Sequence, residues 1–76
     1  MRIKAIFFAG VRERIGVGEK PLELPDGATV ADAWTAVGGA DTGLRILRAV
    51  NEEYCDFRQP LNEGDAVAVF PPVTGG

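Results

Sequence analysis

The residues best suited to chemistry are the last two, Gly75 and Gly76, because they end the chain in a carboxylate with no side chain beside it. A terminal carboxylate is ionised at neutral pH, and it can attack the α-phosphate of ATP to form an acyl-adenylate. The two glycines leave room for a nucleotide pocket to close around that carboxylate. From Ala66 onward no side chain is charged, so the Gly76 carboxylate is predicted to be the reactive group of this segment.

The segment that leads to the two glycines is apolar and contains Pro71 and Pro72. The prolines hold the chain extended and exclude it from a helix or a central strand. Residues 71–76 can span at most about 20 Å, at about 3.3 to 3.6 Å per residue, which is long enough to enter another protein's active site. We therefore expect a domain over residues 1–70 and a flexible C-terminal tail over residues 71–76, with a merely frayed end as the alternative.

The rest of the composition argues against a catalytic centre within this chain. There is no His and no Ser, so the usual general base and the commonest hydroxyl nucleophile are absent. Cys55 is the single cysteine, and without an imidazole beside it we expect a small, partly buried structural residue. The glycines at 38–43 and 16–18 match neither a phosphate-binding loop nor a dinucleotide fingerprint. We therefore expect a non-catalytic protein that binds no metal and no cofactor itself.

Length and charge limit the classes of partner. Seventy-six residues make one domain with a small core and little room for an enclosed active site. The net charge of -3 comes without the clustered Lys and Arg that nucleic acid or an anionic membrane requires. The longest apolar run, from Ala5 to Val11, is too short for a membrane span, and no signal-peptide pattern is complete. We expect a cytoplasmic protein without a nucleic-acid or membrane partner.

The elements that must present the tail follow from hydrophobic periodicity and turn signals. Thr29 and Asp32 predict the N-terminal cap of one main helix, whose apolar stripe places Trp34 in the core. Because Ile6 and Phe8 are apolar, we expect both faces of the first strand to be covered. The predicted strands are Arg2–Ala9, Lys20–Leu24, Arg48–Asn51, a short or irregular Tyr54–Phe57 and Asp65–Phe70, with brief helical turns at Val11–Ile15 and Leu44–Leu47.

The first and last strands are the most apolar, so we expect them to lie side by side and parallel in the centre of the sheet. The main helix then packs across this pair, and the remaining strands pair mostly antiparallel. This order predicts an α+β protein with the β-grasp arrangement, in which a mixed sheet of about five strands packs against one main helix.

Four segments of the chain resemble one family: Ile6–Glu13, Ala49–Asn51, Pro60–Asp65 and, most specifically, Val69–Gly76. On these segments the chain resembles the small, sulfur-carrier subunit of molybdopterin synthase, a family of ubiquitin-like proteins. The resemblance covers both ends and most of the middle, and it is weakest in the glycine-rich stretch from Val37 to Arg45. It implies a ubiquitin-like β-grasp fold.

The resemblance also implies a carrier that its partners load and unload. An E1-like activating enzyme would adenylate Gly76 with ATP and magnesium, and a sulfur source would replace the AMP to give a terminal thiocarboxylate. The tail would then enter the large synthase subunit, where the sulfur attacks cyclic pyranopterin monophosphate and builds the dithiolene of molybdopterin. Two loaded carriers would serve each product, in a heterotetramer of two small and two large subunits.

Individual roles follow from the same resemblance. Gly76 is the modified residue, and Gly75 is its required small neighbour. Phe70, Tyr54 and Arg12 are weaker candidates for contact with the activating enzyme and the large subunit. The alternatives are a core role for Phe70 at its strand end and a role for Tyr54 in covering the sheet edge. The segment implied to insert into the large subunit comprises Phe70, Pro71, Pro72, Val73 and Thr74.

Two other functions would use the same terminus. The sulfur carrier of thiamine thiazole synthesis shares the diglycine chemistry, but its tail is free of proline, unlike the segment from Phe70 to Val73. A ubiquitin-like protein modifier would instead join Gly76 to lysines of target proteins. Lys4 and Lys20 are the only lysines here, so chain building on itself would have few sites.

Overall fold

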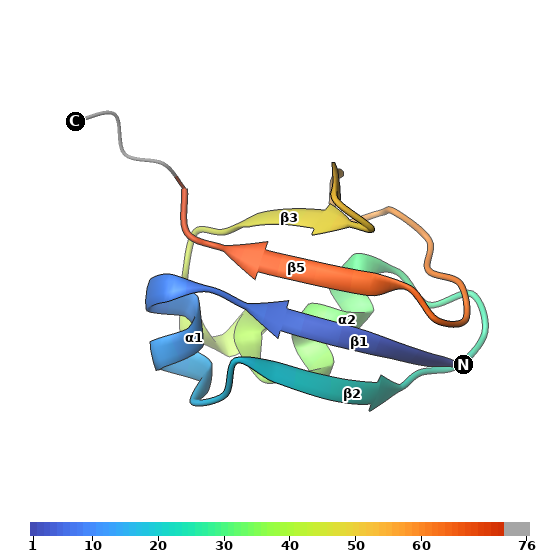
Figure 1. Ribbon diagram of the computed structural model, residues 1–76, viewed down its shortest axis with the longest axis horizontal. Helices are drawn as coiled ribbons and strands as arrows, with labels where there is room; N and C mark the ends of the chain where they lie inside the picture. The colour runs from blue at the N-terminus through green and yellow to red at the C-terminus, as the bar shows by residue number, and fades with distance from the viewer. Residues whose placement is uncertain (73–76) are drawn as a thin grey trace.

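The computed structural model describes residues 1–72 and shows a five-stranded mixed sheet with helices against one side (Figure 1). The strands lie in the order β2-β1-β5-β3-β4. The elements along the chain are β1 (Arg2–Phe7), α1 (Ala9–Ile15), β2 (Glu19–Glu23), α2 (Val30–Ala36), the 3-10 helix η1 (Gly39–Thr42), β3 (Leu47–Val50), β4 (Glu53–Tyr54) and β5 (Ala66–Phe70).

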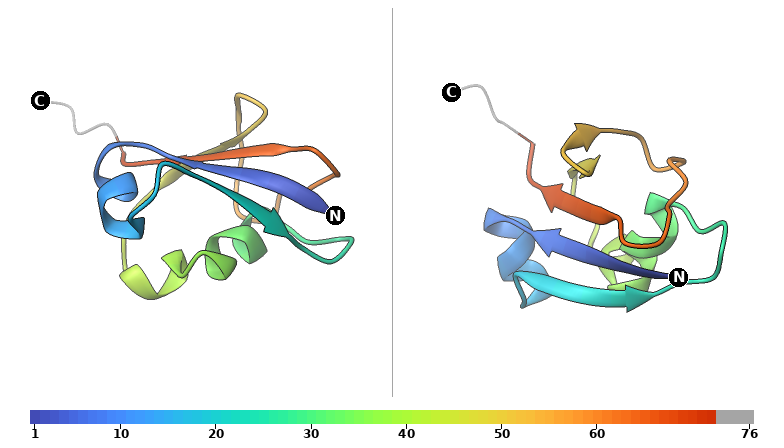
Figure 2. Two further views of the ribbon diagram at one scale, coloured as in Figure 1. Left: turned by 60° about the horizontal axis from the view of Figure 1, so that its bottom comes forward. Right: turned by 45° about the vertical axis from the view of Figure 1, so that its right-hand side comes forward.

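The first and last strands, β1 and β5, are neighbours in the centre of the sheet and run parallel, as predicted. Ala5 lies beside Val67, and Phe7 lies beside Val69. β2 pairs antiparallel with β1, while β3 pairs antiparallel with both β5 and β4. Helices α1 and α2 lie on the same side of the sheet (Figure 2). The predicted α+β class and β-grasp arrangement are therefore confirmed.

The hydrophobic core lies between the sheet and α2. Alternate residues of β1 and β5 point into it, because successive side chains of a strand face opposite sides of the sheet. Trp34 is only 7% exposed, which confirms its predicted place in the core. Its indole ring lies against Gly39, where a Cβ atom would come within 2.2 Å of the ring, so only glycine fits there. The core includes Ile3, Ala5, Phe7, Val11, Leu22, Val30, Ala33, Trp34, Ile46, Leu61, Val67 and Val69.

The start of α2 is held by the predicted cap. The backbone N–H of Thr29 donates to Asp32 Oδ2 at 2.8 Å, and the N–H of Asp32 donates to Thr29 Oγ1 at 3.4 Å. The next free N–H groups of the helix find partners in the loop before β5, because Val30 donates to the carbonyl of Gln59 at 3.0 Å and Ala31 donates to that of Phe57 at 3.0 Å. Within residues 1–72, no helix has the length and apolar character that crossing a membrane requires.

The prediction that both faces of the first strand are covered is wrong. β1 ends at Phe7, and its second face is open: Ile6 is half-buried and Phe8 is 49% exposed. The side chains of β1 alternate as predicted, but the described helices form a layer on only one side of the sheet. The apolar residues of the other side therefore face outward.

The brief helical turn predicted at Leu44–Leu47 is also misplaced. The turn is η1, and Leu44 to Ile46 has no helical structure. Left-handed Gly38 and Gly43, with φ of 81° and 71°, bound η1 and limit it to a single turn. Inside that turn Thr42 Oγ1 donates to the carbonyl of Gly39, and this hydrogen bond joins the two ends of η1.

Candidate functional site

The root of the predicted tail lies at the end of a central strand. β5 ends at Phe70, after which Pro71 is half-buried and Pro72 is exposed. The N–H of Phe8 donates to the carbonyl of Val69 at 3.1 Å, and Phe70 is paired with Leu47 of β3, so the sheet holds the chain up to Phe70. The chain therefore leaves the sheet through two residues that cannot continue it.

The predicted site residues Val73, Thr74, Gly75 and Gly76 lie outside the described residues. The roles assigned to them, and the division into a domain over residues 1–70 and a tail over residues 71–76, stay predictions.

The face of the sheet opposite α2, which we call the open face, is apolar toward the root of the tail. Over β1 and β2 it carries the exposed ion pairs Arg2–Glu23 and Lys4–Glu19. Strand register places side chains on it in a row, because Ile6 lies beside Ala68, Ala68 beside Ala49, and Ala49 beside Tyr54. Tyr54 is 74% exposed, and a shallow hollow lined partly by Ile6, Phe8 and Ala68 lies on the same face. Gathered exposed apolar side chains are typical of a surface that binds a partner.

Three aromatic side chains meet where the open face reaches the root of the tail, and we call them the aromatic row: Phe8, Phe70 and Tyr54. The rings of Phe8 and Phe70 have centroids 6.3 Å apart and are inclined at 78°. Those of Tyr54 and Phe70 are 5.7 Å apart and inclined at 63°. Both are edge-to-face arrangements, which aromatic side chains favour. Phe70 is half-buried and lies outside the core, so the alternative of a core role is wrong.

Phe8 was not among the residues predicted for the site. The sequence shows only that Phe8 is an apolar residue two positions after Ile6, so both side chains share one side of the sheet. It does not show that this side is the open one. Tyr54 lies on the edge strand β4, as its alternative role predicted, but it is too exposed to cover much of that edge.

Arg12 lies on α1, near the same end of the sheet. Its guanidinium passes over Gly18, where an added Cβ atom would come within 3.0 Å of Nε. Arg12 and Phe8 line the same open hollow, which lies between α1 and the start of β2. The structure thus places Arg12 near Phe8 of the aromatic row, while its contact with a partner stays a prediction.

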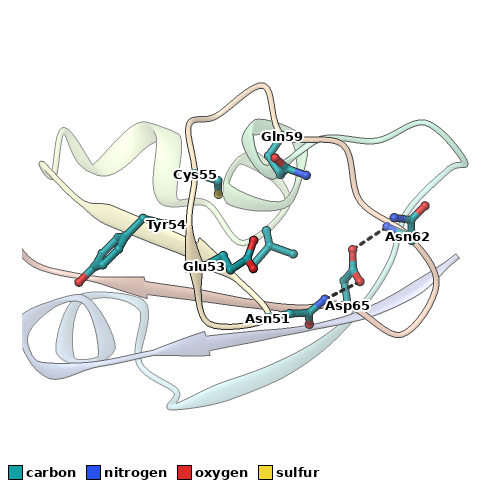
Figure 3. Close-up of a pocket in the computed structure, with 8 residues that line it drawn as sticks. Asn51, Glu53, Tyr54, Cys55, Gln59, Asn62 and Asp65 are labelled. Atoms are coloured by element: carbon teal, nitrogen blue, oxygen red, sulfur yellow. Dashed lines mark hydrogen bonds between the residues drawn. The ribbon is translucent and has the colours of Figure 1, made fainter.

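A polar cleft of about 290 Å³ lies on the other side of Tyr54, between the β3-β4 turn and the loop before β5 (Figure 3). Its polar groups bind one another. Asn51 Nδ2 donates to Asp65 Oδ1 at 2.9 Å, and the N–H of Asn62 donates to Asp65 Oδ2 at 2.8 Å. Asn51 Oδ1 also accepts from the N–H of Ala66 at 3.0 Å. These bonds tie the turn to the start of β5, which is a structural role.

Cys55 borders the same cleft and is half-buried, as the sequence predicted. Burial raises the pKa of its thiol, although the charge of Arg48 opposes that shift. The thiol is therefore mostly protonated at neutral pH and is a poor nucleophile. Within residues 1–72, no three His, Cys, Asp or Glu side chains gather into a group that could hold a metal ion.

Comparison with known proteins assigns the chain to a family. A family model described as the ThiS family matches residues 5–76, nearly the whole chain. The chain belongs to the ThiS family. Among curated relatives, the molybdopterin synthase sulfur carrier subunit of Escherichia coli is 40% identical over 97% of this chain and 99% of its own length. The family resemblance seen in the sequence is therefore confirmed.

Solved structures agree with this family assignment. A Pyrococcus furiosus protein described as molybdopterin converting factor, subunit 1, superposes with a TM-score of 0.85 at 31% identity, over 96% of this chain and 99% of that one. The small archaeal modifier protein 1 of Haloferax volcanii gives a TM-score of 0.82 at 28% identity, over 95% of this chain and 98% of that one. Proteins similar to this chain thus carry two kinds of name: some are called sulfur carriers and others protein modifiers.

Proposed function

We propose that this chain is the sulfur-carrier subunit of a molybdopterin synthase and serves molybdenum cofactor biosynthesis. One observation carries the proposal: the near-full-length similarity to the Escherichia coli subunit of that name, at 40% identity. The diglycine terminus and the apolar open face at the root of the tail support it. The chain itself is a non-catalytic cytoplasmic protein, and its partners carry out the chemistry.

Loading of the carrier takes place at Gly76. The terminal carboxylate attacks the α-phosphate of ATP in an E1-like activating enzyme, with magnesium held by that enzyme, and pyrophosphate leaves. The acyl-adenylate has a good leaving group, so a sulfur donor displaces AMP and leaves a thiocarboxylate on Gly76. Gly75 has no side chain to obstruct this exchange in a narrow pocket.

Unloading takes place in the large synthase subunit. The segment from Phe70 to Thr74 enters that subunit and brings the thiocarboxylate sulfur to cyclic pyranopterin monophosphate. The sulfur attacks a side-chain carbon of the pterin precursor and displaces an oxygen substituent from it. Hydrolysis of the resulting thioester leaves the sulfur on the pterin and regenerates the Gly76 carboxylate. Because a dithiolene contains two sulfurs, two loaded carriers serve each product, in a heterotetramer with two copies of each subunit.

The open face is the surface through which both partners hold the carrier. Exposed Tyr54 and half-buried Phe70 supply aromatic area beside the exit of the tail, and Arg12 adds a positive charge on the rim. Aromatic and Arg side chains are enriched among the residues that dominate binding energy at interfaces. When a partner docks on the open face, residues 70–72 lie against the surface of that partner.

Intact-mass spectrometry tests the loading step. Co-expression with an E1-like activating enzyme and a sulfur donor should add about 16 Da to the chain, since one sulfur replaces one oxygen. The same chain expressed without the activating enzyme is the control and should keep its original mass. A mass that never changes under loading conditions would contradict the proposal.

Mixing the loaded chain with the large subunit and cyclic pyranopterin monophosphate tests the unloading step. We expect the terminal carboxylate to return as molybdopterin forms. A loaded chain that the large subunit cannot unload would favour the thiamine thiazole pathway as the destination of the sulfur.

The similarity to small archaeal modifier protein 1 favours a second candidate function. In that function Gly76 forms an isopeptide bond with lysines of other proteins. Mass spectrometry of digested cell extract would then find the C-terminal peptide of this chain on foreign lysines. Its absence, together with thiocarboxylate formation, would leave the carrier function alone.

A further inference from the structure

Phe70 stands between two rings that other parts of the chain hold in place. Phe8 follows the last residue of β1, Tyr54 ends β4, and Phe70 ends β5. The two outer rings contact Phe70 through edge-to-face arrangements at 6.3 and 5.7 Å. Phe70 therefore has a fixed partner on each side, just before the chain enters two prolines.

The backbones of the two outer residues are themselves anchored. The carbonyl of Phe8 accepts from the N–H groups of Val11 and Arg12, at 3.1 and 3.3 Å, so Phe8 caps α1 through its backbone. Tyr54 is paired in register with Ala49 of β3. The backbones of Phe8 and Tyr54 are therefore fixed by a helix cap and a strand pair, and their rings contact Phe70 from these fixed points. We call these two rings the frame of Phe70.

Phe70 in turn controls the direction of the chain that follows it. Proline fixes its own φ near -65°, and it restricts the residue before it to extended conformations. The backbone of Phe70 is paired with Leu47 of β3 and its ring contacts the frame, so Pro71 and Pro72 have few torsions through which the exit direction could vary.

We propose that Phe8 and Tyr54 are positioning residues, which orient Pro71 and Pro72 through Phe70 so that the C-terminus is presented to a partner in one direction. The inference rests on the proposed function, because it concerns how the carrier's terminus reaches a partner's pocket. The apparent affinity for a partner is reduced when only a fraction of the free chains points in the binding-competent direction. A chain that already points in that direction therefore binds more tightly. The aromatic row then acts before the partner arrives, in addition to any contact it makes afterwards.

Residual dipolar couplings of the free chain test the orientation directly. The one-bond Cα–Hα couplings of Pro71 and Pro72 are measured in a frame defined by the couplings of β1 and β5. In the unmodified chain and in Tyr54→Phe, which keeps the ring, we expect large couplings that fit one orientation. In Tyr54→Leu and Phe8→Leu, which keep apolar surface but lose the ring, we expect these couplings to shrink toward zero.

Steady-state loading by the activating enzyme gives the functional readout. Loss of one edge-to-face pair should lower kcat/KM for thiocarboxylate formation by about 2- to 12-fold. The change should fall on KM and leave kcat near its original value, because fewer chains start in the competent direction. Val17→Ala removes an exposed apolar side chain outside the aromatic row and is the matched control.

The outcomes separate the inference from the proposed function. Unchanged couplings in both Leu variants would overturn the positioning role, even if loading slows, because the rings would then act only as contact surface. Changed couplings without a rise in KM would overturn it as well. An unmodified chain that is never loaded would defeat the proposed sulfur carriage, whereas the couplings of the free chain would still show whether the rings orient the prolines.

Discussion

The covered face and the open face of the sheet take side chains from the same strands. On the covered face of β1, Phe7 is 2% exposed, whereas its neighbour Phe8, on the other side, is 49% exposed. In β5, Val67 is 1% exposed and Ala68 is half-buried on the open face. Residues of similar chemistry therefore differ in burial according to which side α2 covers.

This difference indicates what each face contributes. The covered face supplies the free energy of folding, because burying one large apolar side chain contributes about 1.5 to 3 kcal/mol. The open face leaves apolar area in water beside the exit of the chain, which brings no such stability to the monomer. An apolar surface of this kind is typical of partner binding. Substitutions on the covered face should therefore change stability, and those on the open face should change binding.

The largest expected effect concerns the terminus itself. Deletion of Gly76 should abolish thiocarboxylate formation, because the new terminus is displaced by one residue from the site of adenylation. The free energy of unfolding should not change, since the predicted tail is outside the core. Intact mass and urea denaturation measure the two quantities. A less stable deletion variant would show that the tail is structural.

On the covered face, Trp34→Ala should lower the free energy of unfolding by about 3 to 5 kcal/mol, because it removes a buried aromatic side chain and leaves a cavity. Urea denaturation followed by circular dichroism measures the loss. Tyr54→Ala is the control on the open face. It removes one edge-to-face pair but no buried side chain, so its effect should stay within about 1.5 kcal/mol. Equal losses in the two variants would break the comparison between the faces.

In the centre of the open face, Ala68→Glu should weaken binding of the large synthase subunit by about 2 kcal/mol, or about 30-fold, since its charge would be desolvated without a partner. Isothermal titration calorimetry measures the affinity. Ala36→Glu makes the same change on an exposed position of α2 and should leave binding unchanged. If both variants bind equally well, the large subunit does not use the open face.

The smallest effect should come from the helix cap. Thr29→Ala removes the oxygen that accepts from the N–H of Asp32, and it should cost about 1 kcal/mol of unfolding free energy. Thr29→Ser keeps that oxygen and should restore most of the loss, as thermal or urea denaturation can show. Because α2 covers only one face, binding at the open face should be unaffected by either change.

Local patterns were sufficient for most of the fold. The cap of Thr29 and Asp32, the apolar stripe that includes Trp34, and the alternation in the two central strands each depend on residues a few positions apart. The position of η1 was missed because φ values at Gly38 and Gly43, and not hydrophobic periodicity, decide where that turn closes. The left-handed conformation of the two glycines, and not the spacing of Leu44 and Leu47, therefore determines where the helical turn lies.

The aromatic row could not be found from local patterns, because its members lie at positions 8, 54 and 70 and meet only through strand pairing. The sequence by itself determined the diglycine terminus, the two prolines before it, and which side chains of each strand share a face, since these depend on composition and on a period of two. Only the tertiary structure decided which face is open and that Phe70 stands between Phe8 and Tyr54. The physical reason is that one layer of helices can cover only one side of a sheet, and the side it covers depends on how distant segments pack.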